Sequence, residues 1–173
     1  MDSINYNEHR ANLFNLQKVS WSVFGSLTWN NALHRADTDK ARALRHADFD
    51  TLLTRVCKDL GVRRKHIGYY HATEYGKGNQ CHLHFLLWDK RGCISSEVLA
   101  SKIQEVWNTE FVLARHIGEI ERGAVVEVYD HTCLRKPAVQ YCLKREFDSK
   151  GFEREPWERI SDNLLRHLIW LAK

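Results

Sequence analysis

Residues 66–88 read HIGYYHATEYGKGNQCHLHFLLW, and they give the clearest indication of the fold. Its segments 66–74 and 81–88 are rich in aromatic and large apolar side chains, which favour β-strands. The link between them, YGKGNQ, has the glycines and the asparagine of a hairpin loop. The stretch therefore predicts two neighbouring antiparallel strands.

The segments around this hairpin complete a recognisable order of elements. They are predicted to be a strand at 19–28, a helix from Asp39 to a glycine cap at Gly61, an amphipathic helix at 95–108, a strand at 124–130, a helix at 137–147 and a C-terminal helix at about 156–171. This is the order of a βαββαβ split unit of the ferredoxin or RRM type. We therefore predict an α+β fold with a central antiparallel sheet, helices mainly on one face and the other face open to a substrate.

Apolar stripes indicate which sides of two of these helices are buried. The stripe of the helix at 95–108 consists of Val98, Leu99, Ile103, Val106 and Trp107. The expected buried side of the C-terminal helix consists of Ile160, Leu164, Leu165, Leu168 and Ile169. Both have the spacing of amphipathic helices that pack on a core. We expect residues 1–173 to form one domain, with its core at about 19–147.

The composition narrows the class of protein. Hydrophobic residues make up 43% and charged residues 28% of the 173 residues, as in a globular domain, and the formal net charge is only +4. The five cysteines are scattered without a CxxC pair, which favours reduced thiols over a disulfide framework. No segment approaches the ~20 apolar residues of a membrane span, and the N-terminus lacks an apolar signal core, so we expect no membrane partner.

The second strand of the hairpin carries a candidate metal site. Alternate residues of a strand share a face, so the odd-numbered apolar positions of 81–88 point to the core, and His82 and His84 point to the other side. If the turn centres near Gly78, Glu74 lies opposite His82 on the neighbouring strand. Two imidazoles and one carboxylate leave coordination positions open and suit Mn²⁺ or Mg²⁺ in phosphoryl transfer.

Other interpretations of these residues stay open. An HxH pair in a strand is also found as surface or hydrogen-bonded histidines that hold no metal. His71 is an alternative ligand, but strand alternation places it on the face opposite Glu74, which makes Glu74 the stronger candidate.

Tyr141 and Lys144 form a second candidate constellation, in the predicted helix at 137–147. Positions three apart on a helix are neighbours, and a lysine there favours the phenolate or stabilises charge on a phosphate under attack. A buried tyrosine beside a solvated lysine is the plainer interpretation of the same spacing. Further basic or polar residues that suit phosphate contact, or simply a solvated face, are Gln140 and Arg145 beside this pair, Arg63, Arg64 and Lys65, and Arg135 and Lys136.

Taken together, these motifs resemble those of the HUH endonucleases, most closely the single-tyrosine rolling-circle replication initiators. The HLH at 82–84 is preceded by Glu74 and followed by YCLK at 141–144, in the order of that family. GSLTWNN at 25–31 is similar to the first motif of those initiators, a strand followed by polar residues that helps to read the origin.

The resemblance implies a role for each motif residue. His82 and His84 correspond to the metal ligands of the HUH motif and Glu74 to the acidic ligand, with Mn²⁺ or Mg²⁺ as the cofactor. Tyr141 corresponds to the nucleophile, and Lys144 to the lysine that follows it by three. The implied activity is a sequence- or structure-specific nickase and ligase, which initiates rolling-circle replication through a covalent 5′-phosphotyrosine.

The resemblance also implies partners. The substrate is single-stranded or hairpin origin DNA, and, because the chain has no Walker GxxxxGK[ST], a host or otherwise separate helicase and polymerase are expected. The location is cytoplasmic for a bacterial, plasmid or phage protein and nuclear for one of a eukaryotic virus. The expected DNA contacts are Thr28, Asn30, Arg63, Arg64, Lys65, Arg135, Lys136, Gln140 and Arg145. Trp29 or Tyr70 are candidates for base stacking, and core packing is an equally good interpretation of each.

Rival functions use the same scaffold. A single-tyrosine transposase tends to carry a glutamine where this chain has Lys144, and a relaxase usually carries three histidines in its metal motif. A non-catalytic RNA- or DNA-binding module places aromatic residues on the open face, where this chain is predicted to carry histidines and a carboxylate. A degenerate nuclease kept for binding is also compatible with the sequence.

Overall fold

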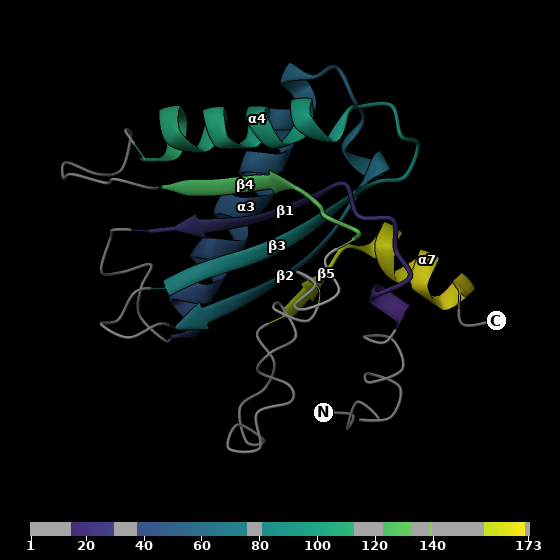
Figure 1. The fold of residues 1–173 in the computed structure, drawn as a ribbon. Helices are drawn as coiled ribbons and strands as arrows, with labels where there is room; N and C mark the ends of the chain where they lie inside the picture. The colour runs from purple at the N-terminus through teal and green to yellow at the C-terminus, as the bar shows by residue number, and fades with distance from the viewer. Residues whose placement is uncertain are drawn as a thin grey trace.

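The computed structural model describes residues 15–29, 38–75, 81–112, 123–132, 139 and 158–171. These residues form an α+β fold around an antiparallel sheet, which has five strands in the order β4-β1-β3-β2-β5. Figure 1 shows how the helices are arranged around this sheet. The strands are β1 (Val23–Thr28), β2 (Ile67–Tyr75), β3 (Cys81–Asp89), β4 (Ala124–Val128) and β5 (Glu158–Ile160). The first four have the order of the predicted split unit, which is confirmed.

Three longer helices of the described residues accompany the sheet. They are α3 (Asp39–Asp59), α4 (Ser96–Val106), which continues as a π-helical turn over Trp107–Val112, and α7 (Asp162–Leu171). The Thr38 hydroxyl caps α3 by accepting from the Ala41 amide at 3.2 Å, and the Ser95 hydroxyl caps α4 in the same way. Gly61 follows α3 with φ of 66°, as a glycine C-cap should. None of the described helices has the length and apolar character that a bilayer crossing requires.

The C-terminal region differs from its prediction. Residues 158–160, expected to begin a helix, instead pair with the edge of β2, where Ile160 faces Tyr70, and α7 starts only at Asp162. The free hydrogen-bonding edge of β2 explains the difference, because a sequence pattern does not show which edge lies within reach. Leu165 and Ile169 of α7 are 37% and 49% exposed, so the buried side of this helix is narrower than predicted. Val98 of α4 is likewise exposed.

Two apolar clusters lie on the two faces of the sheet. The larger one fills the space between the sheet and helices α3 and α4, and includes Leu83, Phe85 and Leu87 of β3. The smaller one lies on the face of the histidines and consists of Leu16, Val19, Trp21, Tyr70, Leu86, Trp88, Val139, Leu164 and Leu168. The face that carries the histidines was expected to be open. Near the end of β3, however, α7 and residues from 15–21 cover part of this face (Figure 1). Large apolar side chains such as Leu86 and Trp88 on this face require that cover.

Candidate functional site

The candidate site is built on three adjacent strands. Thr28 of β1 lies opposite His82 of β3, and His82 lies opposite Glu74 of β2. In the next row Ser26 of β1 lies opposite His84 of β3. The register therefore places Glu74 beside His82, as the hairpin loop predicted.

Both histidines are held by hydroxyl groups from β1. The Ser26 Oγ lies 2.6 Å from the Nδ1 of His84, and the Thr28 Oγ1 lies 2.9 Å from the Nδ1 of His82. The two rings have their centroids 6.3 Å apart at an interplanar angle of 31°. His84 is buried, with 8% of its surface exposed, and His82 is half-buried. These contacts hold the imidazoles side by side on the face away from α3 and α4.

The arrangement suits a divalent cation on the Nε2 side of each ring. A metal-binding imidazole commonly donates its second ring N–H to an oxygen, which fixes the tautomer and the ring orientation. Ser26 and Thr28 place an oxygen beside each Nδ1 atom, and in the tautomer that donates to these oxygens Nε2 is the ring atom that can bind a metal. Among the side chains that the structure describes, no third His, Cys, Asp or Glu completes a metal site with these two. The side chain of Glu74 lies outside that described set, so its role as the third ligand stays a prediction.

His84 also has an aromatic neighbour. The ring of Phe24 on β1 is stacked with the His84 ring, with a centroid distance of 6.2 Å and an interplanar angle of 13°. Phe24 packs in turn against the smaller apolar cluster, which includes Leu86 two residues beyond His84. One side of the histidine pair is thus shielded from water, which strengthens electrostatic interactions at the site.

His71, the alternative ligand, lies on the other face of the sheet. It is 1% exposed, and its Nε2 lies 3.2 Å from the Nδ1 of His46 on α3. Its ring is also stacked with Tyr69 and meets Phe49 edge-on. His71 therefore belongs to the packing beneath α3, separate from His82 and His84.

The two residues suggested for base stacking are buried, so this suggestion is wrong. Trp29 is 2% exposed, donates its Nε1–H to Asp48 at 3.0 Å and packs against Trp107. Tyr70 is fully buried in the smaller apolar cluster. Aromatic side chains of this size fill core space, and one sequence alone does not show which of them reach the surface.

The basic cluster at 63–65 lies at the other end of the sheet from the histidines. It precedes β2, whose first residue, Ile67, pairs with the last residue of β3. Arg64 is engaged within the fold: it donates to the Ile67 carbonyl at 2.9 Å, lies 3.6 Å from an Asp50 oxygen and covers the Tyr69 ring. Arg63 and Lys65 are exposed. The structure therefore does not bring this cluster to the candidate metal ligands.

The other predicted site residues lie outside the described residues. They are Asn30, Arg135, Lys136, Gln140, Tyr141, Lys144 and Arg145. Of the helix predicted at 137–147, the structure describes Val139, which is helical and fully buried in the smaller apolar cluster.

Residues 22–146 match the model of a protein family described as replication-associated protein ORF2. The chain belongs to this family. As a member of the ORF2 family it is a replication-associated protein, which agrees with the predicted class of replication initiators. No curated protein and no solved structure matches the chain.

The match extends over the elements that carry the site in this ORF2 family member. It begins just before β1 and includes β2, β3 and β4, and it also includes Tyr141 and Lys144. The hydroxyl groups of Ser26 and Thr28, the histidines and the candidate nucleophile therefore all lie within the family segment.

Ser26 is a site residue that sequence reasoning missed, and Thr28 was assigned to DNA rather than to His82. A signal was present: Ser26 and Thr28 alternate along β1 as His82 and His84 do along β3. Once β1 and β3 are known to be neighbours, the two pairs must face each other. That neighbour relation was not used, because it joins segments more than fifty residues apart.

Proposed function

We propose that this chain is a metal-dependent nickase that cuts single-stranded or hairpin origin DNA and initiates rolling-circle replication. In this proposal His82, His84 and Glu74 bind Mn²⁺ or Mg²⁺, and Tyr141 is the nucleophile. The observation that carries the proposal is the pair of histidines on one face of β3, each fixed at Nδ1 by a hydroxyl of β1, in a member of a replication-associated family.

The reaction exchanges one phosphodiester for another. The Tyr141 oxygen forms a bond to the scissile phosphorus as the bond from phosphorus to the 3′ oxygen breaks. The phenolic proton is lost, the leaving 3′ oxygen gains a proton, and the 5′ phosphate remains linked to the tyrosine. Because one phosphodiester replaces another, the energy of the broken bond is retained in the link to the tyrosine. The same residues can therefore rejoin the strand without another source of energy.

In this reaction some side chains orient the metal-binding rings, and others stabilise charge. Ser26 and Thr28 hold the rings of His84 and His82, so the ligand atoms need little reorganisation when the cation binds. Lys144 stabilises the phenolate or the charge on the phosphate under attack. A cation bound by these ligands supplies a Lewis acid for the phosphate oxygens.

The position of Val139, two residues before Tyr141, supports the proposal. Val139 packs with Leu86 and Trp88 on the face of the sheet that carries His82 and His84.

The test is a denaturing gel with a pool of single-stranded and hairpin oligonucleotides, labelled at either the 5′ or the 3′ end. With Mn²⁺, wild type should shift the 3′-labelled strand covalently and release a shorter 5′-labelled strand that a polymerase can extend. EDTA and Tyr141→Phe should abolish both products. Tyr129→Phe is the matched control, because this tyrosine follows β4 and packs against His131, and it should behave as wild type.

Three results would contradict the proposal. Cleavage that survives in Tyr141→Phe would assign the nucleophile elsewhere. A covalent shift of the 5′-labelled strand would mean that the tyrosine bonds to the other side of the break. Tight binding without an adduct on any oligonucleotide, including fragments of the cognate origin, would favour a non-catalytic binding module.

A further inference from the structure

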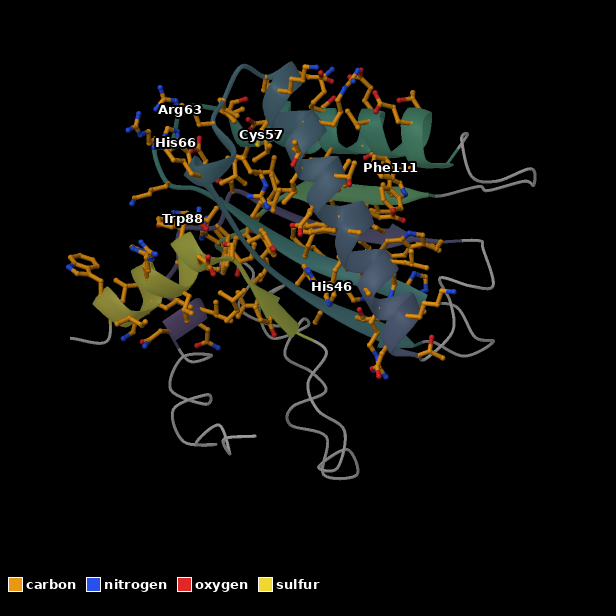
Figure 2. All side chains as sticks on the ribbon, turned by 180° about the vertical axis from the view of Figure 1, so that it is seen from behind. His46, Cys57, Arg63, His66, Trp88 and Phe111 are labelled. Carbon is orange, nitrogen blue, oxygen red and sulfur yellow. The ribbon has the colours of Figure 1, made fainter. Side chains whose placement is uncertain are left out.

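Four exposed cations gather at the end of the sheet that lies away from the histidines. Arg63 and Lys65 precede β2, and Lys90 and Arg91 follow β3. The β2–β3 pairing brings the two segments together, since the Lys90 amide donates to the His66 carbonyl at 3.0 Å. Figure 2 labels Arg63, His66 and Trp88 at this end of the molecule, near α7. We call Arg63, Lys65, Lys90 and Arg91 the basic end.

Helix α7 places aromatic rings beside the basic end. Asn163 of α7 donates its side-chain N–H to the Lys65 carbonyl at 3.0 Å, which ties the helix to the segment before β2. The His167 ring is stacked on Trp88, with centroids 4.3 Å apart, and Trp170 is stacked on His167 at 5.9 Å. Trp170 is 69% exposed, the highest value among the exposed large hydrophobic residues that the structure describes.

The charges of the basic end are available to a ligand. In the part of the chain that the structure describes, none of the four cations takes part in an ion pair. The nearby Asp89 carboxylate is buried and accepts from the backbone amides of Arg91 and Ile94, so it presents little negative charge to solvent. Loss of solvation and then the positive charges of Arg91, Lys65 and Arg63 lower the pKa of His66, which agrees with a positive potential here.

We propose that the basic end and Trp170 form a second nucleic-acid contact, which binds single-stranded DNA outside the nick site. Cations that follow a phosphate backbone, together with an exposed ring that accepts a base, are the two parts of a sequence-tolerant single-strand surface. The inference rests on the proposed function only for the choice of DNA as the polymer. It does not depend on the histidines, on the metal or on Tyr141.

The distance between the histidines and the basic end indicates the role of the second contact. His82 lies near the start of β3, whereas Lys90 of the basic end follows the last residue of that strand. At about 3.3 Å per residue, the seven residues from His82 to Asp89 span about 23 Å. That is about seven nucleotides at a stacked spacing of 3.4 Å. The basic end therefore holds a flanking part of the strand and adds affinity without taking part in the chemistry.

The experiment measures binding of the full chain to fluorescent oligo(dT) of twenty nucleotides, in EDTA, over a series of salt concentrations. The variants are the double substitution Lys65→Gln with Lys90→Gln, and separately Trp170→Ala. The matched control is Lys40→Gln with Lys102→Gln, which removes the same charge from α3 and α4 on the other side of the sheet. Melting temperatures of all four proteins show whether the variants are folded.

The double variant should reduce the slope of log K against log salt by about 1.4, or about 0.7 for each phosphate that is no longer neutralised, while the control keeps the wild-type slope. Trp170→Ala should weaken binding to oligo(dT) about tenfold, with a smaller loss on duplex of the same length. Because the assay needs no cleavage, these losses would support the second contact even if no DNA were ever nicked.

Unchanged slopes and affinities in both folded variants would overturn the inference. So would oligo(dT) binding at the wild-type level combined with loss of binding to phosphatidylserine vesicles, because that result would assign the surface to a lipid headgroup. An equal loss in the Lys40 and Lys102 control would also overturn it, since the effect would then come from net charge rather than from this surface.

Discussion

The Ser26 Oγ lies 2.6 Å from the Nδ1 of His84, across the pairing of β1 with β3. The Thr28 hydroxyl stands in the same relation to His82, at 2.9 Å. In the tautomer in which Nδ1 donates to the hydroxyl, Nε2 carries the lone pair with which a neutral imidazole binds a metal. The strand beside the histidines thus does more than complete the sheet, because its hydroxyl groups orient both imidazole rings.

Ser26→Ala should weaken Mn²⁺ binding about 10- to 100-fold, the loss that is typical when an oxygen behind a metal-binding imidazole is removed. The His84 ring then loses the hydroxyl that holds its orientation. Isothermal titration calorimetry with Mn²⁺ measures the effect directly. Ser101→Ala, at an exposed serine of α4, is the control and should keep the wild-type affinity. An unchanged affinity in Ser26→Ala would show that this hydroxyl does not orient a ligand.

Glu74→Gln should reduce Mn²⁺ affinity more than Ser26→Ala does, because it removes the charge of a proposed ligand, whereas Ser26→Ala removes a neutral group behind a proposed ligand. The register that places Glu74 opposite His82 is the basis of this expectation. Glu97→Gln in the first turn of α4 is the matched control. An unchanged Mn²⁺ affinity in Glu74→Gln would show that Glu74 is not a metal ligand and that another group completes the site.

The hairpin that carries the site could be predicted because its information is local. Strand alternation places His82 and His84 on one face, and the short link to β2 sets the register with Glu74. The elements of the split unit followed in the same way, from periodicity and from the glycine cap at Gly61.

The parts that failed depend on contacts between distant segments. Whether residues 158–160 form a helix or an edge strand depends on the free edge of β2, which is far away in sequence. Trp29 was a candidate for base stacking, but its indole N–H donates to Asp48 of α3 within the core, a contact between segments nineteen residues apart. Leu165 and Ile169 fit a buried stripe, yet α7 is short and meets the sheet mainly through Leu164 and Leu168.

Gly25→Ala should lower the free energy of unfolding by about 1–3 kcal/mol, the usual cost of forcing extra volume into a packed core. A Cβ on Gly25 would lie 2.4 Å from the ring of Phe85, its partner across the β1–β3 pair. Urea denaturation gives the difference. The double variant Gly25→Ala with Phe85→Leu should recover part of the loss, since it removes the clashing ring atoms. A single variant as stable as wild type would mean that the ring moves aside freely.

The stability of the chain should also depend on the protonation of His167. Desolvation, followed by the positive charge of Lys90, lowers the pKa of His167 below its ordinary value of 6.5. The unfolded chain then takes up a proton at higher pH than the folded chain, so the contribution of His167 is present above about pH 6.5. It is lost as the pH falls from there through the pKa of the folded state.

Two measurements check this dependence. An NMR titration of the His167 ring should give a pKa below 6.5, and urea unfolding between about pH 5 and 8 should show a smaller acid loss in His167→Gln than in wild type. Because the ring is stacked between Trp88 and Trp170, the variant should also be less stable at about pH 8, where the histidine is neutral. A pKa at or above 6.5 would contradict this prediction. So would an equal decrease in the free energy of unfolding of the two proteins as the pH falls, because His167 would then not contribute to the acid sensitivity of the fold.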